Sequence, residues 1–148
     1  MKIYFAAAIR GAKEPVAAEI YKSLIVYLQN YGSVLTEHIA NAEIFTNGEP
    51  AFSDSYIYKR DVNWLLSADL VIAEVTYPSL GVGFEIATAV EHNKLIFCLK
   101  KKGSKKISAM ISGCDKLELK EYSNISEAKK LIANYIKKKF PATSSNGK

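Results

Sequence analysis

The chain has 148 residues, of which 49% are hydrophobic and 24% charged, and its formal net charge is +5. This length and balance predict one globular domain with a full core and no second domain. Because no 18 apolar residues run together, and the short apolar run at residues 2–9 is followed by Arg10, neither a membrane span nor a signal peptide is expected. We therefore expect no membrane contact and a cytoplasmic location, with the nucleus left open.

Apolar runs alternate with amphipathic stretches along the chain. Hydrophobic periodicity predicts strands at residues 3–8, 33–36, 70–75, 95–99 and 116–119, and helices at 14–30, 54–68, 82–92 and 126–140. Gly32 is expected to end the first helix, and Ser53 and Ser126 are expected at the starts of the second and the last. Residues 41–52 are expected to be irregular, and Pro141 to end the last helix before a disordered tail.

This order of elements predicts the fold class. Strands alternating with helices favour an α/β, single-domain, three-layer α/β/α sandwich over residues 1–140, with a tail at 141–148. Its five-stranded, mainly parallel sheet would be Rossmann-like or flavodoxin-like. Ligands of such sheets bind beyond the carboxyl ends of the strands. The loops expected there are residues 8–11, the stretch from His38, and residues 76–83.

The third of these loops combines serine, glycine and a carboxylate. Gly81 and Gly83 leave room for a ligand near the backbone, and a helix start offers free N–H groups to a phosphate. Alternatively, the glycines only shape a tight turn and Ser79 only caps the helix. Glu85 follows about one turn into the helix, where the dipole is expected to keep it ionised, as a nucleophile requires. A glutamate there can also serve the dipole alone.

Asp61 is the candidate partner of Glu85. Two-carboxylate chemistry needs one ionised and one protonated group, and Asp61 could be the protonated one, although an aspartate in mid-helix is often merely solvated. His38 could line a base pocket or simply form a structural hydrogen bond. No His, Cys or Asp cluster has metal spacing, and the GVGFE run is no dinucleotide fingerprint, so no metal and no cofactor are expected.

Lysines gather at residues 100–106 and 137–139. Such clusters can attract phosphorylated ligands or nucleic acid, or they can be solvated surface. Because no nucleic-acid motif accompanies them, no nucleic-acid partner is expected. Cys98 and Cys114 lack CxxC spacing and are expected to be free thiols.

Several segments together resemble one known family. They are YFAAAIRG at residues 4–11, LTEH at 35–38, Asp61 with Trp64, PSLGVGFE at 78–85 and SAMI at 108–111. In this order they look like the 2'-deoxynucleoside 5'-monophosphate N-glycosidases of the nucleoside 2-deoxyribosyltransferase superfamily. The match runs from about residue 2 to residue 135.

The resemblance implies a role for each matching residue. Glu85 would be the nucleophile that forms a glycosyl-enzyme, Asp61 would assist departure of the base, and Tyr4 would lie beside the sugar. The resemblance places substrate-binding residues in the first-strand loop, after the second strand and in the glycine-rich segment: Ala8, Ile9, Arg10, Gly11, His38, Ser79 and Gly81. It further implies that Ser108, Ala109 and Met110 reach the phosphate in a neighbouring subunit, and hence a homodimer.

One position departs from the family pattern. The family has a serine where this chain has Ala8, so a hydroxyl near the phosphate would be missing. An unreplaced hydrogen bond of this kind costs roughly 1–3 kcal/mol, although backbone N–H groups at Ile9 and Arg10 or a water could replace it.

Three functions follow as alternatives. The first is hydrolysis of deoxynucleoside 5'-monophosphates to free base and 2-deoxyribose 5-phosphate. The second is deoxyribosyl transfer between bases, against which Ser79 and Ser108 favour a phosphate. The third is a non-catalytic nucleotide sensor on the same fold, against which the presence of both Glu85 and Asp61 argues. The sequence leaves the preferred base open.

Overall fold

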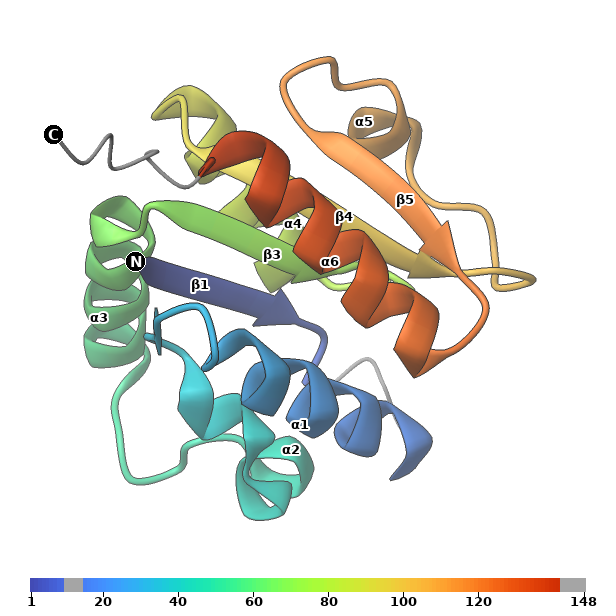
Figure 1. The fold of residues 1–148 in the computed structure, drawn as a ribbon. Coiled ribbons are helices and arrows are strands. Elements are labelled where there is room, and N and C mark those ends of the chain that lie inside the picture. The colour runs from blue at the N-terminus through green and yellow to red at the C-terminus, as the bar shows by residue number, and fades with distance from the viewer. Residues whose placement is uncertain (10–14, 142–148) are drawn as a thin grey trace, which may run out of the picture.

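The computed structural model describes residues 1–9 and 15–141. Within these residues, five strands form one sheet in the order β2-β1-β3-β4-β5, and every neighbouring pair is parallel (Figure 1). The strands are β1 (Lys2–Ala7), β2 (Ser33–Val34), β3 (Leu70–Glu74), β4 (Leu95–Lys101) and β5 (Glu118–Tyr122). The predicted α/β class and five-stranded sheet are confirmed, and the sheet is parallel throughout.

Helices cover both faces of this sheet. In Figure 1, α1 (Pro15–Leu28) and α6 (Ile125–Lys139) lie in front of the sheet and α4 (Leu80–Glu91) lies behind it. The face of α4 also carries α3 (Asp54–Ser67), whose Leu65 joins the same core cluster as Val82 and Ile86. Three shorter helices complete the described chain: the 3-10 helix η1 (Glu37–Ala40), α2 (Ala42–Asn47) and α5 (Ala109–Ser112).

Alternation along β1 decides which side chains face the site. Ile3 and Phe5 join the core beneath α1 and α6, whereas Tyr4 and Ala6 join the core beneath α3 and α4. This is the period of two that an extended chain imposes. Tyr4 thereby points toward the layer that contains α4.

The structure corrects several predicted boundaries. Residues 41–52 are not wholly irregular, because Asn41 caps α2 with its side chain. The last helix is capped by Asn124 and not by Ser126, and β5 lies two residues later than expected. The first helix ends at Leu28. Gly32 therefore does not cap that helix, and a Cβ there would lie 2.0 Å from the Met1 carbonyl oxygen where the chain enters β2.

The predicted second strand, residues 33–36, extends two residues beyond the observed strand β2. Beyond Val34, Leu35 N–H donates to the Ile3 carbonyl at 2.9 Å. The Thr36 hydroxyl then accepts from Phe5 N–H at 2.9 Å and donates to the Phe5 carbonyl at 2.8 Å. A buried side chain thus continues the pairing with β1, and it brings residues 36–38 to the carboxyl edge of the sheet.

A buried carboxylate holds the start of the loop between β3 and α4. Glu74 is 1% exposed, and it accepts hydrogen bonds from the Tyr122 hydroxyl at 3.0 Å and from the Thr76 hydroxyl. Thr76 Oγ1 in turn accepts from Lys101 N–H at 2.9 Å. Burial raises the pKa of Glu74, and the two hydroxyl donors oppose that rise. The loop that leads to Ser79 is therefore tied to β4 and β5.

In the part of the chain that the structure describes, no helix has both the length and the apolar character that crossing a membrane would need. Of the predicted tail, only Pro141 is described.

Candidate active site

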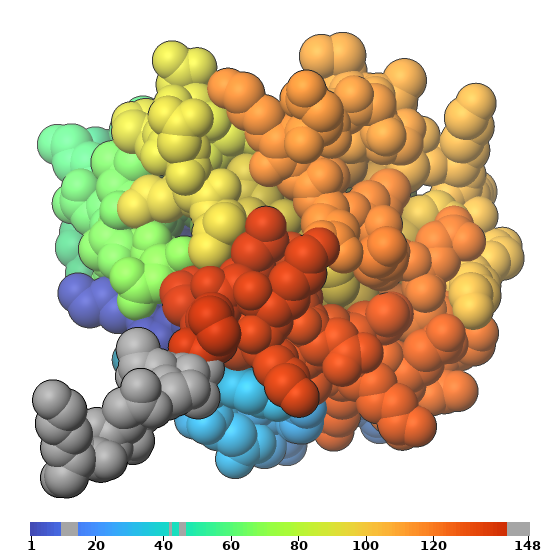
Figure 2. All heavy atoms as spheres, turned by 45° about the horizontal axis from the view of Figure 1, so that its top comes forward, coloured from blue at the N-terminus to red at the C-terminus, as the bar shows by residue number. Residues whose placement is uncertain are grey.

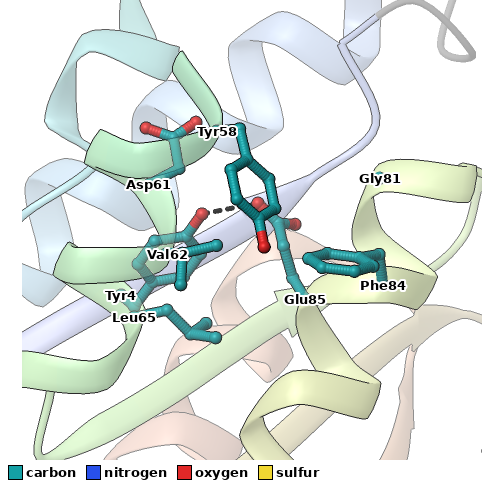
Figure 3. A pocket seen from close by; sticks show the side chains of 8 residues that line it. All are labelled: Tyr4, Tyr58, Asp61, Val62, Leu65, Gly81, Phe84 and Glu85. Atoms are coloured by element: carbon teal, nitrogen blue, oxygen red, sulfur yellow. Dashed lines mark hydrogen bonds between the residues drawn. The ribbon is translucent and has the colours of Figure 1, made fainter. Parts of the chain in front are cut away.

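Three of the predicted site residues meet at the carboxyl edge of the sheet. Tyr4, Asp61 and Glu85 line two cavities in common, and Figure 3 shows the first of them. The first cavity is closed mainly by apolar side chains of α3 and α4: Tyr58, Val62, Leu65 and Phe84. The second extends toward η1 and α2 and contains the more polar groups Thr36, His38 and Glu49. The three shared residues come from β1, α3 and α4.

Tyr4 and Glu85 are joined directly. The Tyr4 hydroxyl donates a hydrogen bond of 2.5 Å to Glu85 Oε1, drawn as the dashed line in Figure 3. The contact forms because Tyr4 points from β1 toward α4, and because Glu85 lies one turn after the start of that helix. Burial and the Glu85 carboxylate both raise the pKa of Tyr4, so its hydroxyl remains a donor.

The protonation of Glu85 differs from the sequence prediction. Burial raises its pKa to about 7, the nearby Asp61 adds to the rise, and the hydrogen bond from Tyr4 opposes it. The expectation that the helix dipole keeps this carboxylate ionised near neutral pH is met only in part, because a group with this pKa is about half ionised at pH 7. Burial favours the neutral acid, and Glu85 lies beyond the first turn of α4, where the helix dipole is mainly felt. At neutral pH, Glu85 is poised between its acid and its nucleophilic form.

Asp61 belongs to an ionic network that the sequence analysis did not predict. Arg60 Nε donates to Asp61 Oδ1 at 2.8 Å. The same guanidinium holds both oxygens of Glu49, from Nη1 at 2.6 Å and from Nη2 at 2.7 Å. His38 Nε2 lies 3.3 Å from Glu49 Oε1, so His38 both lines the second cavity and is hydrogen-bonded. Burial lowers the pKa of His38.

Two further residues were missed for a clear reason. Arg60 precedes Asp61 in a polar stretch, and Glu49 lies in a segment that was expected to be irregular. Only a long-range contact between helix and loop could reveal that they pair. The one available sequence signal was the position of a cation beside the candidate aspartate.

The glycine-rich segment is helical and not a loop. Helix α4 begins at Leu80, two residues earlier than predicted, so Gly81 and Gly83 lie in its first turn. Neither has a positive φ, and because both lie within the helix they do not form a separate turn between strand and helix. A Cβ at Gly81 would lie 3.7 Å from Ser79 Oγ, and a Cβ at Gly83 would meet nothing within 4 Å. The fold of one chain therefore tolerates alanine at both positions.

Ser79 is the cap of this helix. Its Oγ accepts a hydrogen bond from Val82 N–H at 3.3 Å. Gly81 lines the first cavity and Ile9 the second, whereas Ala8 is fully buried in the core. The substrate contact expected of Ala8 stays a prediction. The expected contacts of Arg10 and Gly11 lie outside the described residues.

The segment Ser108–Met110 is not part of the cavity of its own chain. Ser108 caps α5 by accepting a hydrogen bond from Met110 N–H at 3.2 Å. Ile107 and Ile111 pack against the core cluster that includes α4, while the Met110 side chain is 82% exposed. Figure 2 shows this segment, in orange, on a surface that also carries α4, in yellow. The Met110 side chain is therefore an exposed apolar group on this face.

The lysine clusters and cysteines are partly accounted for by structural contacts. Lys100 is buried in β4 and lies 2.9 Å from Glu121, and Lys102 lies 3.2 Å from Glu127. Cys98 and Cys114 are free, as expected. Among the described residues, no three His, Cys, Asp or Glu side chains converge in a way that could hold a metal ion.

Fold and site together define an α/β protein with a cleft at the carboxyl edge of a parallel sheet, and this cleft presents a half-buried glutamate of raised pKa. The family model described as nucleoside 2-deoxyribosyltransferase matches residues 3–134. This chain belongs to that family, which confirms the resemblance seen in its sequence.

Named relatives agree with this membership. A Nematostella vectensis protein, named for 2'-deoxynucleoside 5'-phosphate N-hydrolase activity, is 50% identical over 117 residues, covering 77% of this chain and 78% of its own. A 5-hydroxymethyl-dUMP N-hydrolase of Danio rerio is 40% identical over 147 residues, covering 99% and 100%. The solved CMP N-glycosidase BcmB of Clostridium botulinum has the same fold, with a TM-score of 0.66 at 19% identity over 91% of this chain and 99% of that one.

Proposed function

We propose that this protein hydrolyses the N-glycosidic bond of 2'-deoxynucleoside 5'-monophosphates, releasing free base and 2-deoxyribose 5-phosphate, through a glycosyl-enzyme on Glu85. The observation that carries the proposal is the 2.5 Å contact between Tyr4 and Glu85 in a cleft that Asp61 also lines. The expected enzyme class, an N-glycosidase, agrees with the names of the relatives.

The mechanism follows from the charge that builds on the sugar. As the C1'–N bond breaks, its electron pair leaves with the base and positive charge develops at C1'. Ionised Glu85 stabilises this charge and then bonds to C1'. Asp61 assists departure of the base, whose nitrogen takes a proton from solvent. Water then attacks C1', its proton passes to solvent, and the bond from C1' to Glu85 breaks, which yields the free sugar phosphate and restores the carboxylate.

The phosphate is proposed to lie at the start of α4. Free N–H groups there attract an anion, and the two glycines let its oxygens approach the backbone. Anchoring the phosphate near Ser79 and Gly81 would place C1' one helical turn further on, at Glu85. A 2'-deoxy sugar ionises more readily than ribose, and Tyr4 crowds the sugar position, so deoxynucleotides should be preferred.

The assembly is proposed to be a homodimer in which Ser108, Ala109 and Met110 complete the neighbouring site. Supporting it are the exposed apolar side chains on the face of α4 and α5: Leu80 is 96% exposed, Met110 82% and Phe84 50%. A monomer would leave this apolar group in water beside its own cleft.

The test is release of free base from a panel of nucleotides: dCMP, dGMP, dUMP, 5-hydroxymethyl-dUMP and their ribo counterparts. Wild type should release base without an added acceptor, and Glu85→Gln should release none detectably. A transferase would require an acceptor base, and a sensor would release nothing. Faster cleavage of CMP than of dCMP would overturn the deoxynucleotide preference.

A further inference from the structure

The arginine beside the candidate aspartate has no free face for a substrate. Its guanidinium donates to Asp61 from Nε and to both oxygens of Glu49 from Nη1 and Nη2. A further contact, from Nη2 to His38 Nε2, measures 3.5 Å. The Arg60 side chain is 12% exposed and that of Glu49 is 11% exposed. Arg60 is thus committed to protein partners and not to a nucleotide phosphate.

Aromatic rings enclose this ionic network. The Arg60 guanidinium carbon lies 4.7 Å from the ring centroid of Trp64 and 5.9 Å from those of Phe52 and Tyr56. Trp64 also packs against the His38 ring, with a centroid distance of 5.6 Å. The low exposure of the Arg60 and Glu49 side chains strengthens their charge pairs and makes a lost partner costly.

The network connects the wall of the second cavity to the reaction centre. Glu49 follows α2 after Gly48, whose φ is 69°, and both residues line that cavity. Asp61 lies on α3 and lines both cavities. In the view of Figure 3, the Asp61 carboxyl group is turned away from the Tyr4–Glu85 hydrogen bond. The Arg60 contact accounts for that orientation, because it holds Oδ1 from the side of Glu49.

We propose that Arg60 is a positioning residue, which fixes the carboxyl group of Asp61 for departure of the base and holds Glu49 in the wall of the second cavity. The inference rests on the proposed N-glycosidase function. A planar guanidinium suits this task because it serves three carboxylate oxygens at fixed angles, and a lysine ammonium cannot reproduce that geometry.

The experiment is a double-mutant cycle on base release. Arg60→Ala should lower kcat about 10- to 100-fold, the size of effect that misplacing a catalytic group produces, and should change KM less than about threefold. Arg60→Lys should fall between Arg60→Ala and wild type. In the Asp61→Asn background, Arg60→Ala should cost little further, because the group that Arg60 positions is already disabled.

Lys102→Ala is the matched control, since it breaks an exposed ion pair with Glu127, neither residue lines either cavity, and it should leave kcat unchanged. Circular dichroism and thermal unfolding of each variant report the folded fraction, and Arg60→Lys keeps the test open if Arg60→Ala does not fold. Equal kcat losses from Arg60→Ala with and without Asp61→Asn would overturn the positioning role alone. No base release by wild type would overturn the proposed function and this inference together.

Discussion

At the scale of the residue, Glu85 combines two opposing demands. Its carboxylate must be ionised to attack C1', yet burial raises its pKa to about 7. The hydrogen bond from Tyr4 partly compensates, because it stabilises the charged form. At high pH, burying this carboxylate in its ionised form lowers the free energy of unfolding. The opposing effects on Glu85 can therefore be measured in stability and in activity.

The first prediction concerns stability. Between its ordinary pKa of 4.5 and its folded pKa of about 7, Glu85 binds more protons in the folded than in the unfolded state, so stability falls as the pH rises. The loss is absent below the lower value and complete above the upper one. Glu85→Gln should therefore raise the free energy of unfolding by about 1–3 kcal/mol at pH 8 and leave it unchanged near pH 4.

Urea unfolding of wild type and Glu85→Gln at both pH values checks this difference. Glu91→Gln, an exposed change at the end of the same helix, is the control for general charge effects. Equal stability of wild type and Glu85→Gln at pH 8 would show that burial does not penalise this carboxylate.

The second prediction concerns the pH dependence of base release. Because the ionised carboxylate is the active form, kcat/KM should rise with pH and level off above about 7. Tyr4→Phe removes the donor that lowers the pKa of Glu85, so this limb should move to higher pH. Tyr58→Phe removes another hydroxyl from the same cavity but leaves the Tyr4–Glu85 bond intact, and its limb should stay in place. A limb that Tyr4→Phe leaves unmoved would contradict the assignment.

At the scale of the element, α4 begins with two glycines that its own chain does not require. A Cβ at either position finds adequate space, and glycine inside a helix is about 0.5–1 kcal/mol less favourable than alanine. The first turn of α4 is therefore less stable than it would be with alanine at these two positions. Close approach of a ligand or of a partner subunit is the physical reason that remains.

The third prediction uses this difference. Gly81→Ala should raise the free energy of unfolding by about 0.5–1 kcal/mol, because alanine favours the helix. The same change should raise KM for a deoxynucleoside monophosphate, because the added methyl group occupies the proposed phosphate position. Chemical denaturation and steady-state kinetics measure the two effects. Ala87→Gly, on the exposed side of α4, is the inverse control, which should lower stability and leave KM alone. An unchanged KM in Gly81→Ala would contradict the proposal that the phosphate lies at the start of α4.

At the scale of the whole molecule, the face of α4 and α5 differs from the opposite face. It gathers the most exposed apolar side chains, Leu80 and Met110, beside the cleft. The segment Ser108–Met110 also lies outside the cavity of its own chain, which fits a role in the site of a second copy.

The fourth prediction tests that assembly. Met110→Glu should convert a dimer to a monomer, because it would bury a charge in the proposed interface. Val26→Glu changes an equally apolar, exposed residue on α1, across the sheet, and should leave the dimer intact. Sedimentation velocity distinguishes these outcomes. A monomeric wild type would contradict the proposed homodimer.

Subunit mixing then asks whether the sites are shared. Glu85→Gln chains and Ser108→Asp chains should each be nearly inactive, since the second change repels the phosphate. Mixed dimers should regain activity, because one of their two sites has neither substitution. Unchanged activity after subunit exchange would place Ser108 outside the neighbouring site.

Most of the fold was predictable because its signals are local. Alternating apolar runs located the five strands and the main helices, and the position of Glu85 after a serine and glycine segment placed it at the ligand edge of the sheet. The errors concern helix boundaries and short helices, which periodicity does not define. Asn124 competed with Ser126 as a helix cap, and the short helix α2 carries too few residues for a periodic pattern.

The sequence by itself determined the α/β class, the ligand edge and the family, because these depend on periodicity and on ordered motifs. Only the tertiary structure decided the state of the site. It showed that burial raises the pKa of Glu85, that the glycines lie inside α4, and that Arg60 joins Asp61 to Glu49. Burial and charge pairing arise between segments far apart in the chain, so no local pattern contains them.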